Sequence, residues 1–393
     1  MTSVTGNSSH DISRDNSRDI ILVANTIDEL GGVQRVTHNL ATMLHERGHR
    51  VTVIGIQHAA VVHDYGERPY RSLVLNERPE PAPPKVTALR ARLDPRVRSA
   101  RRAYARAHQG SVDRLSSVFG EVEHGIVVVM QVWSMNWVAE ADTSHLHVIG
   151  MSHESFDATL GSTRWERVSR YYRDVDLLLL LTERDATRFE LEGFNNVGVM
   201  HNSLSFYPEL TSDVSAPVVV AAGRYAPEKG YDRLIQAFSR VADDHPDWVL
   251  RILGHGPLHG QLVKQVQRLG LVGRVELPGL AQDIEAELRG ASVFALSSIH
   301  EGLPMALAEA MACAVPAVAF DCAPGVREIV TDGVDGIVVP PRDVAGLALG
   351  LDRLMGDPAL RRRYGEAARA NVRRFAPDAV LSQWEDAFAL VER

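Results

Sequence analysis

The sequence has few cysteines and lacks a long apolar run, and both features limit what the protein can be. Only two of the 393 residues are cysteine, Cys313 and Cys322. This fits a reducing compartment, and we expect both thiols to be inert and in the core. No apolar stretch reaches the roughly 18–20 residues that span a bilayer. Residues 1–18 are polar without the apolar region of a signal peptide, so we predict a disordered tail. We therefore expect a cytoplasmic protein, and leave open a peripheral position at the inner membrane face.

The sequence also lacks an excess of positive charge and a metal-binding motif. A formal net charge of −8 argues against nucleic acid as a general partner. There are 16 histidines, but no H-E-x-x-H motif and no paired Cys/His spacing. We therefore expect neither a metal site nor a bound cofactor. A G-x-S-x-G nucleophile motif and a Walker lysine motif are absent as well.

What the sequence does contain is a repeated alternation of strand-like and helix-like segments. "IILVAN" (20–25), a glycine-containing loop, a helical segment and "RVTVIGI" (50–56) form a βαβ unit, typical of a parallel sheet. The alternation breaks near 205–216 and restarts at "PVVVAAG" (217–223). We predict an α/β protein with two tandem, doubly wound, Rossmann-like domains and a ligand cleft between them. The expected parts are a tail (1–18), an N-terminal domain (19–205), a linker (206–216), a C-terminal domain (217–376) and a final helix (377–393) that returns to the N-terminal domain.

Residues 58–124 do not follow this alternation. They include a segment, Lys85–Arg106, with eight Lys/Arg residues against one Asp. Such a segment is either a solvated helical face or a surface that attracts an anionic acceptor or a membrane. Because Pro95 interrupts the segment, we predict two short helices there.

The segment "EGLPMALAEAMACAVPAVAF" (301–320) is almost wholly apolar but contains two glutamates, Glu301 and Glu309. We predict a helix from about Leu303 to Cys313, with Gly302, Leu303 and Pro304 at its N-terminus. Free N–H groups and the helix dipole favour an anion there, most simply phosphate. A carboxylate beside phosphate would be repelled unless it binds hydroxyl groups. The segment therefore indicates a sugar nucleotide, with phosphates at the helix end and glutamates on hydroxyls.

Four further clusters follow predicted strands and so lie at the same kind of sheet edge. Arg224 and Lys229 in "GRYAPEKG" (223–230) could clamp a diphosphate or be solvated loop residues. Gly32 in "DELGGVQR" (28–35) indicates either a tight turn or close approach to a ligand, and it is not a dinucleotide fingerprint. His153 in "GMSHESF" (150–156) is structural or contacts a ligand. Gly256 lies in the similar loop "GHGPLHG" (254–260).

Taken in order, these motifs resemble the retaining glycosyltransferases of the GT-B fold, family four. The resemblance covers most of residues 19–393 and is strongest from 217 to 340. The pair Glu301 and Glu309 is similar to that family's E-x7-E motif. "GGVQRV", "HES", "GRYAPEKG", "GHGP" and "VTDGVDGIVVPP" (330–341) add to it.

The resemblance implies a role for each position. Glu301 would contact hydroxyls of the donor sugar and Glu309 the ribose, while Arg224 and Lys229 would hold the diphosphate. His153 would lie near the reacting centre. The remaining expected donor contacts are Gly32, Gly256, Gly302, Leu303 and Pro304, with Leu277, Gly279 and the rest of segment 277–280 at the base.

The resulting hypothesis is a metal-independent retaining glycosyltransferase. It would move a hexose or N-acetylhexosamine from a nucleotide-diphosphate sugar, most simply a UDP-sugar, to a hydroxyl of a cell-envelope polymer, a lipid or a natural product. Two alternatives stay open at this point. One is a non-hydrolysing sugar-nucleotide epimerase of related fold, and the other is a sugar-nucleotide-binding protein without catalytic activity.

Overall fold

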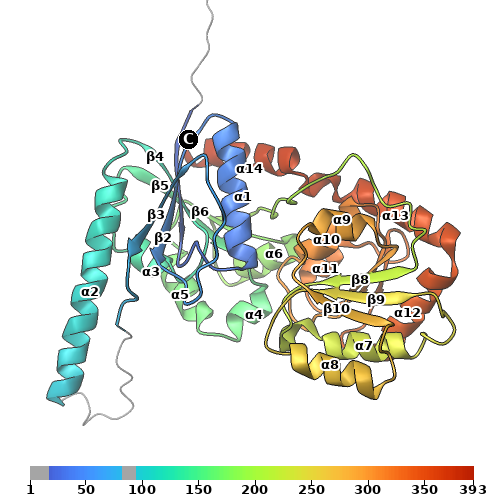
Figure 1. The fold of residues 1–393 in the computed structure, drawn as a ribbon. Helices are drawn as coiled ribbons and strands as arrows, with labels where there is room; N and C mark the ends of the chain where they lie inside the picture. Colours follow the sequence, from blue (N-terminus) through green and yellow to red (C-terminus); the bar gives the residue numbers. More distant parts are fainter. Residues whose placement is uncertain (1–16, 82–93) are drawn as a thin grey trace, which may run out of the picture.

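A computed structural model describes residues 17–81 and 94–393, which form two α/β domains lying side by side (Figure 1). One sheet has seven strands in the order β3-β2-β1-β4-β5-β6-β7, and the other has six in the order β10-β9-β8-β11-β12-β13. Neighbouring strands are parallel in both sheets. The strands of the first sheet are β1 Asp19–Ala24, β2 Arg50–Gln57, β3 Arg71–Asn76, β4 Gly125–Val129, β5 Leu146–Ser152, β6 Leu177–Leu180 and β7 Val197–Val199. Those of the second are β8 Val218–Ala222, β9 Val249–Leu253, β10 Val275–Gly279, β11 Val293–Leu296, β12 Ala317–Phe320 and β13 Gly336–Val339.

The strands form where the sequence has short, continuous runs of Val, Ile, Leu and Ala. Every residue of β6, β11 and β12 is buried, as expected for parallel strands that are covered on both faces. The first domain's helices are α1 Gly32–Glu46, α2 Pro95–Phe119, α3 Met135–Val138, α4 Phe156–Leu160, α5 Arg164–Tyr171 and α6 Glu183–Leu191. Later helices are α7 Tyr231–Ser239, α8 His259–Arg268, α9 Ile284–Arg289, α10 Met305–Ala312, α11 Pro324–Ile329, α12 Val344–Gly356, α13 Pro358–Val372 and α14 Pro377–Val391.

In each sheet the strand order reverses about a central pair, β1 with β4 and β8 with β11. The chain leaves the two strands of such a pair toward opposite sides of the sheet, which opens a crevice at their carboxyl ends. The loops that follow these strands carry most of the predicted site residues.

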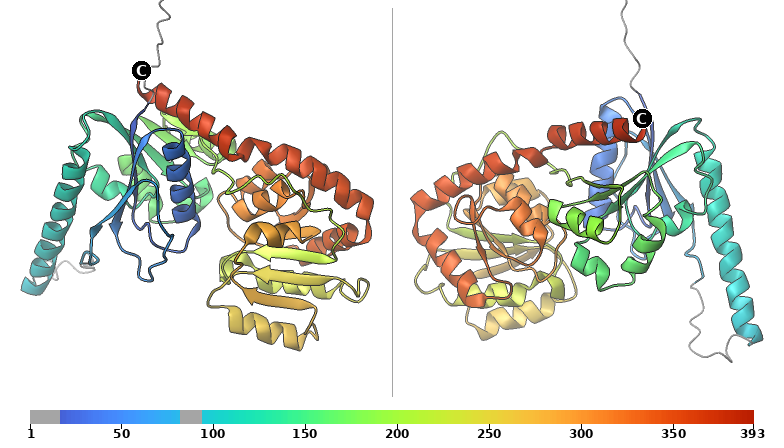
Figure 2. Two further views of the ribbon diagram at one scale, coloured as in Figure 1. Left: turned by 45° about the horizontal axis from the view of Figure 1, so that its top comes forward. Right: turned by 180° about the vertical axis from the view of Figure 1, so that it is seen from behind.

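Helix α14 leaves the second domain and packs against the first (Figure 2). Glu385 of α14 accepts from Arg18 Nη1 at 2.7 Å and lies 2.8 Å from His49 Nε2. Trp384 and Phe388 are buried in the same core cluster as Leu40 of α1. The domains are therefore joined by two chain segments, the one between β7 and β8 and the one that enters α14.

The region 58–124 contains an element that the sequence did not reveal and one that it predicted wrongly. Strand β3 extends the first sheet at its edge. Helix α2 is a single helix of 25 residues that begins at Pro95, so the prediction of two short helices is wrong for the described part. A proline at the first helical position costs nothing, and the side chain of Asp94 caps the helix by accepting from Arg96 N at 2.8 Å. The segment 82–93 lies outside the described residues.

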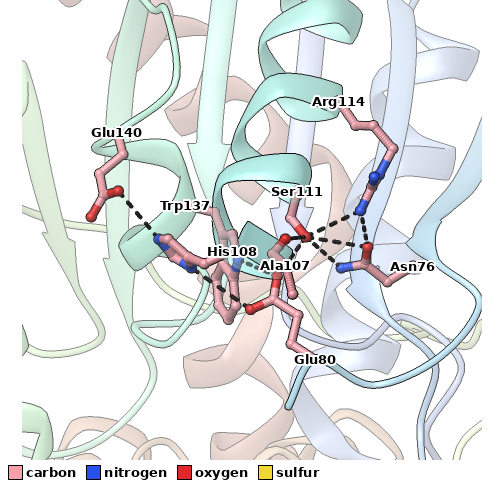
Figure 3. A network of polar contacts seen from close by, with 8 residues as sticks. All are labelled: Asn76, Glu80, Ala107, His108, Ser111, Arg114, Trp137 and Glu140. Carbon is pink, nitrogen blue, oxygen red and sulfur yellow. Dashed lines mark hydrogen bonds and ion pairs between the residues drawn. The ribbon is translucent and has the colours of Figure 1, made fainter. Parts of the chain in front are cut away.

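Only the C-terminal part of α2 is packed into the domain. A buried network fastens it there (Figure 3): Ser111 Oγ and Trp137 Nε1 both donate to Glu80 Oε1, at 2.5 and 2.8 Å. Buried positions on the helix begin at Ser111. The N-terminal half extends past the strands, on the side of the first domain away from the second (Figures 1 and 2).

Candidate active site

The centre of the candidate site is an ion pair between two loops of the second domain. Lys229 ends a short 3-10 turn after β8, and Glu301 lies between β11 and α10. Lys229 Nζ is 2.6 Å from Glu301 Oε1, and Ser298 Oγ donates to the same oxygen at 2.6 Å. The side chains of Lys229 and Glu301 are only 24% and 12% exposed. Because β8 and β11 are the central pair of the sheet, the fold itself brings this cation and this carboxylate together.

Close backbone packing fixes the position of Lys229. Gly230 has φ +60°, and a Cβ at this residue would lie 2.2 Å from the carbonyl oxygen of Ser297. Ser297 Oγ also donates to the carbonyl oxygen of Lys229 at 2.8 Å. The glycine at this position therefore lets the 223–230 loop lie directly on the segment that carries Glu301.

His153 brings the first domain into contact with this site. A Cβ at Gly302 would lie 2.1 Å from the carbonyl oxygen of His153, so the two backbones touch across the cleft. Burial lowers the pKa of His153 to about 4, and interactions with Asn202 and the Met130 carbonyl oppose this only in part. Among the described residues neither ring nitrogen, Nδ1 or Nε2, has a hydrogen-bond partner of normal geometry. Burial therefore favours the uncharged imidazole at neutral pH.

The second glutamate of the predicted pair has different partners. Glu309 lies on α10 and is 1% exposed; Ser205 Oγ donates to its Oε1 at 2.9 Å, and Arg35 Nη2 lies 3.1 Å from the same oxygen. Burial raises the pKa of Glu309, while Arg35 and Ser205 act in the opposite direction. Arg35 belongs to α1 of the first domain. The eight-residue spacing thus places Glu301 at the Lys229 loop and Glu309 at an ion pair between domains.

The remaining predicted residues surround this centre less closely. Arg224 is 67% exposed and pairs with Glu228 at 2.6 Å rather than with Glu301. A Cβ at Gly32 would meet no atom within 4 Å, whereas one at Gly256 would clash with the Tyr225 backbone. Leu303 is buried, and Pro304 is the N-cap of α10, so this helix begins later than predicted. Leu277 and Gly279 lie on β10.

Sequence reasoning gave no role to three residues of the site, Arg35, Ser205 and Ser298. Arg35 stands at the end of "DELGGVQR", beside the two glycines, so its position in a motif was a usable signal. Ser298 is the second residue after β11. Ser205 lies in the segment between the domains, where no sequence pattern marks it.

The described residues contain no group of three or more His, Cys, Asp or Glu side chains able to hold a metal ion. In the same residues, no helix combines the length and the apolar character needed to cross a bilayer. Both cysteines are free thiols. Burial raises the pKa of Cys313 and of Cys322 to about 12, so neither is a ready nucleophile.

Comparisons with known proteins show which proteins this chain resembles. Residues 207–371 match the family described as glycosyl transferases group 1. An exopolysaccharide phosphotransferase of Streptomyces coelicolor is 38% identical over 262 residues, which are 65% of this chain and 28% of that protein. The chain thus spans under a third of that relative. The phosphatidyl-myo-inositol mannosyltransferase of Mycobacterium leprae is 28% identical over 390 residues, 91% of this chain and 92% of that one.

Solved structures show the same fold. HepE of Anabaena, in complex with UDP and glucose, superposes with a TM-score of 0.73 at 20% identity, covering 94% of this chain and 99% of that chain. The prediction of a GT-B fold with two Rossmann-like sheets is therefore confirmed.

Proposed function

Because residues 207–371 match the glycosyl transferases group 1 family and the chain has the GT-B fold, we propose that the protein is a retaining glycosyltransferase. It moves a hexose or N-acetylhexosamine from a nucleotide-diphosphate sugar, with a UDP-sugar favoured, to a hydroxyl of its acceptor. The observation that carries the proposal is the pair of Lys229 and Glu301 at the strand-order reversal of the second sheet, beside the N-terminus of α10. The UDP and glucose bound to HepE support the choice of donor.

In this proposal the donor lies along the carboxyl ends of the second sheet. Lys229 and Arg224 bind the diphosphate, together with the backbone at Gly302–Pro304. Glu301 accepts from hydroxyls of the sugar, and Glu309 from the ribose. Further contacts come from Gly32 of the first domain and from Gly256, Leu277 and Gly279, with segment 277–280 at the base.

The reaction breaks the bond between C1 of the sugar and the diphosphate oxygen. Positive charge develops on the sugar ring and negative charge on the leaving diphosphate. In this proposal Lys229, Arg224 and the α10 N-terminus stabilise the leaving group, the task that a metal ion would otherwise perform. The acceptor oxygen attacks from the face that the diphosphate leaves, and a phosphate oxygen takes its proton. The anomeric configuration is then retained.

The lowered pKa of His153 suits this chemistry. An imidazolium beside a developing oxocarbenium ion would repel it. Because burial keeps His153 uncharged at neutral pH, the ring can bind a sugar hydroxyl without opposing the positive charge of the transition state.

The first domain is proposed to bind the acceptor, which we expect to be a cell-envelope molecule. Relatives named for exopolysaccharide and phosphatidyl-myo-inositol support this class. The projecting half of α2 carries exposed arginines, among them Arg98, Arg102 and Arg106 at four-residue spacing. Within a chain of net charge −8, such a concentration of cations attracts an anionic acceptor or a peripheral membrane surface.

The first experiment is a thermal-shift and mass-spectrometric screen of nucleotide sugars, followed by NMR of the products. Transfer to an added acceptor with retention at C1 supports the proposal. An epimer formed without acceptor would favour the epimerase alternative, and donor binding without any turnover would favour a non-catalytic protein. Unchanged turnover in Glu301→Ala, Lys229→Ala and Arg224→Ala together would overturn the assignment of the site.

A further inference from the structure

Glu309 lies where both domains and the segment between them meet. Its Oε1 atom is held by Arg35 of α1 at 3.1 Å and by Ser205 of the connecting segment at 2.9 Å. Asn39, one turn after Arg35 on α1, donates to Ser205 Oγ at 3.1 Å. One oxygen of this second-domain carboxylate is thus held by groups from the first domain and from the segment that connects the two domains.

This arrangement leaves a ribose hydroxyl to compete with Arg35 for Oε1 of Glu309. A ribose hydroxyl must approach a carboxylate oxygen to about 2.5–3.0 Å. Glu309 is only 1% exposed, and the Arg35 guanidinium lies 3.1 Å from its Oε1 atom. Arg35 itself is 40% exposed, and its long side chain can swing away without a movement of the backbone. If Oε1 of Glu309 accepts a ribose hydroxyl, the guanidinium has to give up its place on that oxygen.

The start of α1 offers the guanidinium a second position. Arg35 is in the first turn of this helix, whose N-cap, Gly31, provides no side-chain hydrogen bond and whose first turn has no acidic residue. A Cβ on the neighbouring Gly32 would meet no atom within 4 Å, so the space there is open. The uncapped N–H groups, the helix dipole and a guanidinium released from Glu309 together suit a diphosphate.

We propose that Arg35 is a donor-responsive positioning residue. In the empty cleft it neutralises and covers Glu309. When the donor enters, the ribose hydroxyls replace the guanidinium on Glu309, and Arg35 moves to the diphosphate. After the exchange the carboxylate accepts hydrogen bonds from the ribose hydroxyls and the guanidinium is paired with the diphosphate, so occupation of the donor site is coupled to the contact between the domains. This inference rests on the proposed function, because it takes the ribose as the ligand of Glu309.

The proposal predicts opposite effects on two ligands. Uridine has the ribose but no phosphate. It therefore competes with Arg35 for Glu309 and gains no phosphate contact from the guanidinium. In Arg35→Ala, measured by calorimetric titration at pH 8 to favour the ionised carboxylate, uridine should bind about three- to tenfold more tightly. UDP should bind about three- to tenfold more weakly, because it loses a phosphate contact. Thr42→Ala is the matched control, because Thr42 lies two turns further along the same helix and its hydroxyl donates to the carbonyl oxygen of His38; it should change both affinities less than about twofold.

Three outcomes decide the matter. Tighter binding of uridine together with weaker binding of UDP supports the exchange. Equal losses of affinity for both ligands would show that Arg35 only orients Glu309, and this result would overturn the proposed exchange. Unchanged affinity for both ligands would overturn it too. If the wild-type protein binds no nucleotide, the proposed function itself fails, which is a distinct result.

A second measurement does not depend on uridine. In a double-mutant cycle of Arg35→Ala with Glu309→Gln, followed by thermal unfolding, the coupling between the two residues should be present without ligand and disappear with saturating UDP. Coupling that persists under UDP would contradict the exchange.

Discussion

Lowering the pH should destabilise the protein through His153 more than through any exposed histidine. Burial holds the pKa of His153 at about 4, against 6.5 for a solvated imidazole. Between pH 6.5 and pH 4 the unfolded chain therefore binds a proton at this residue that the folded chain does not. Stability from this source is fully present above pH 6.5, falls as the pH drops, and levels off below about pH 4.

The size of the effect follows from the same two values. A difference of one pKa unit corresponds to about 1.4 kcal/mol, so acidification to pH 4 should cost about 3 kcal/mol at His153 alone. His153→Gln removes the titrating group but keeps a polar side chain of related shape. The free energy of unfolding of the wild type should therefore fall by about 3 kcal/mol more than that of the variant between pH 7 and pH 4.

Urea unfolding followed by circular dichroism at pH 7, 5.5 and 4 measures this difference directly. His147→Gln is the matched control, because His147 lies on β5, the strand that ends directly before His153, and has a 41% exposed side chain; it should follow the wild type at every pH. If His153→Gln and the wild type lose stability equally, the imidazole is solvated in solution. An uncharged His153 beside the transition state would then be refuted as well.

The site makes further predictions. Lys229→Ala should lower the rate of transfer, followed by NMR of the products, about 30- to 1000-fold, since one preorganised charge is worth about 2–4 kcal/mol; Lys229→Arg should recover part of this rate in the same assay. Gly302→Ala places a methyl group 2.1 Å from the His153 carbonyl and should cost about 1–3 kcal/mol in thermal unfolding, whereas Gly32→Ala, with open space, should leave the fold intact. The double charge reversal Arg102→Glu with Arg106→Glu should weaken use of an anionic acceptor, more strongly at low salt; an equal effect at all salt concentrations would leave α2 as a solvated helix.

The sequence predicted the sheets well, because continuous apolar runs such as 125–129 and 177–180 can only be buried strands in an α/β fold. It did not reveal β3, which lies at the sheet edge. Most residues of this strand are partly or fully exposed, and they show little alternation between apolar and polar side chains. It misjudged Pro95, since the same residue can break a helix or begin one, and only the cap at Asp94 decides between these.

The site was predicted unevenly for a related reason. The sequence shows that Lys229 and Glu301 each follow a strand. These strands, β8 and β11, are neighbours in the sheet, and the fold therefore brings the two residues together. The pair of Glu309 and Arg35 depends on how the two domains face each other, and nothing in a local pattern encodes that. Contacts between domains are therefore the part of a site that is hardest to predict from a single sequence.

The return of α14 to the first domain has a consequence for the order of synthesis. His49 and Glu385 are in contact although 336 residues separate them in the chain. The apolar side of α1 that receives Trp384 and Phe388 therefore emerges from the ribosome long before its cover exists. During translation the first domain carries an uncovered apolar strip that could associate with a chaperone or with another nascent chain, and it closes only after the second domain has been made.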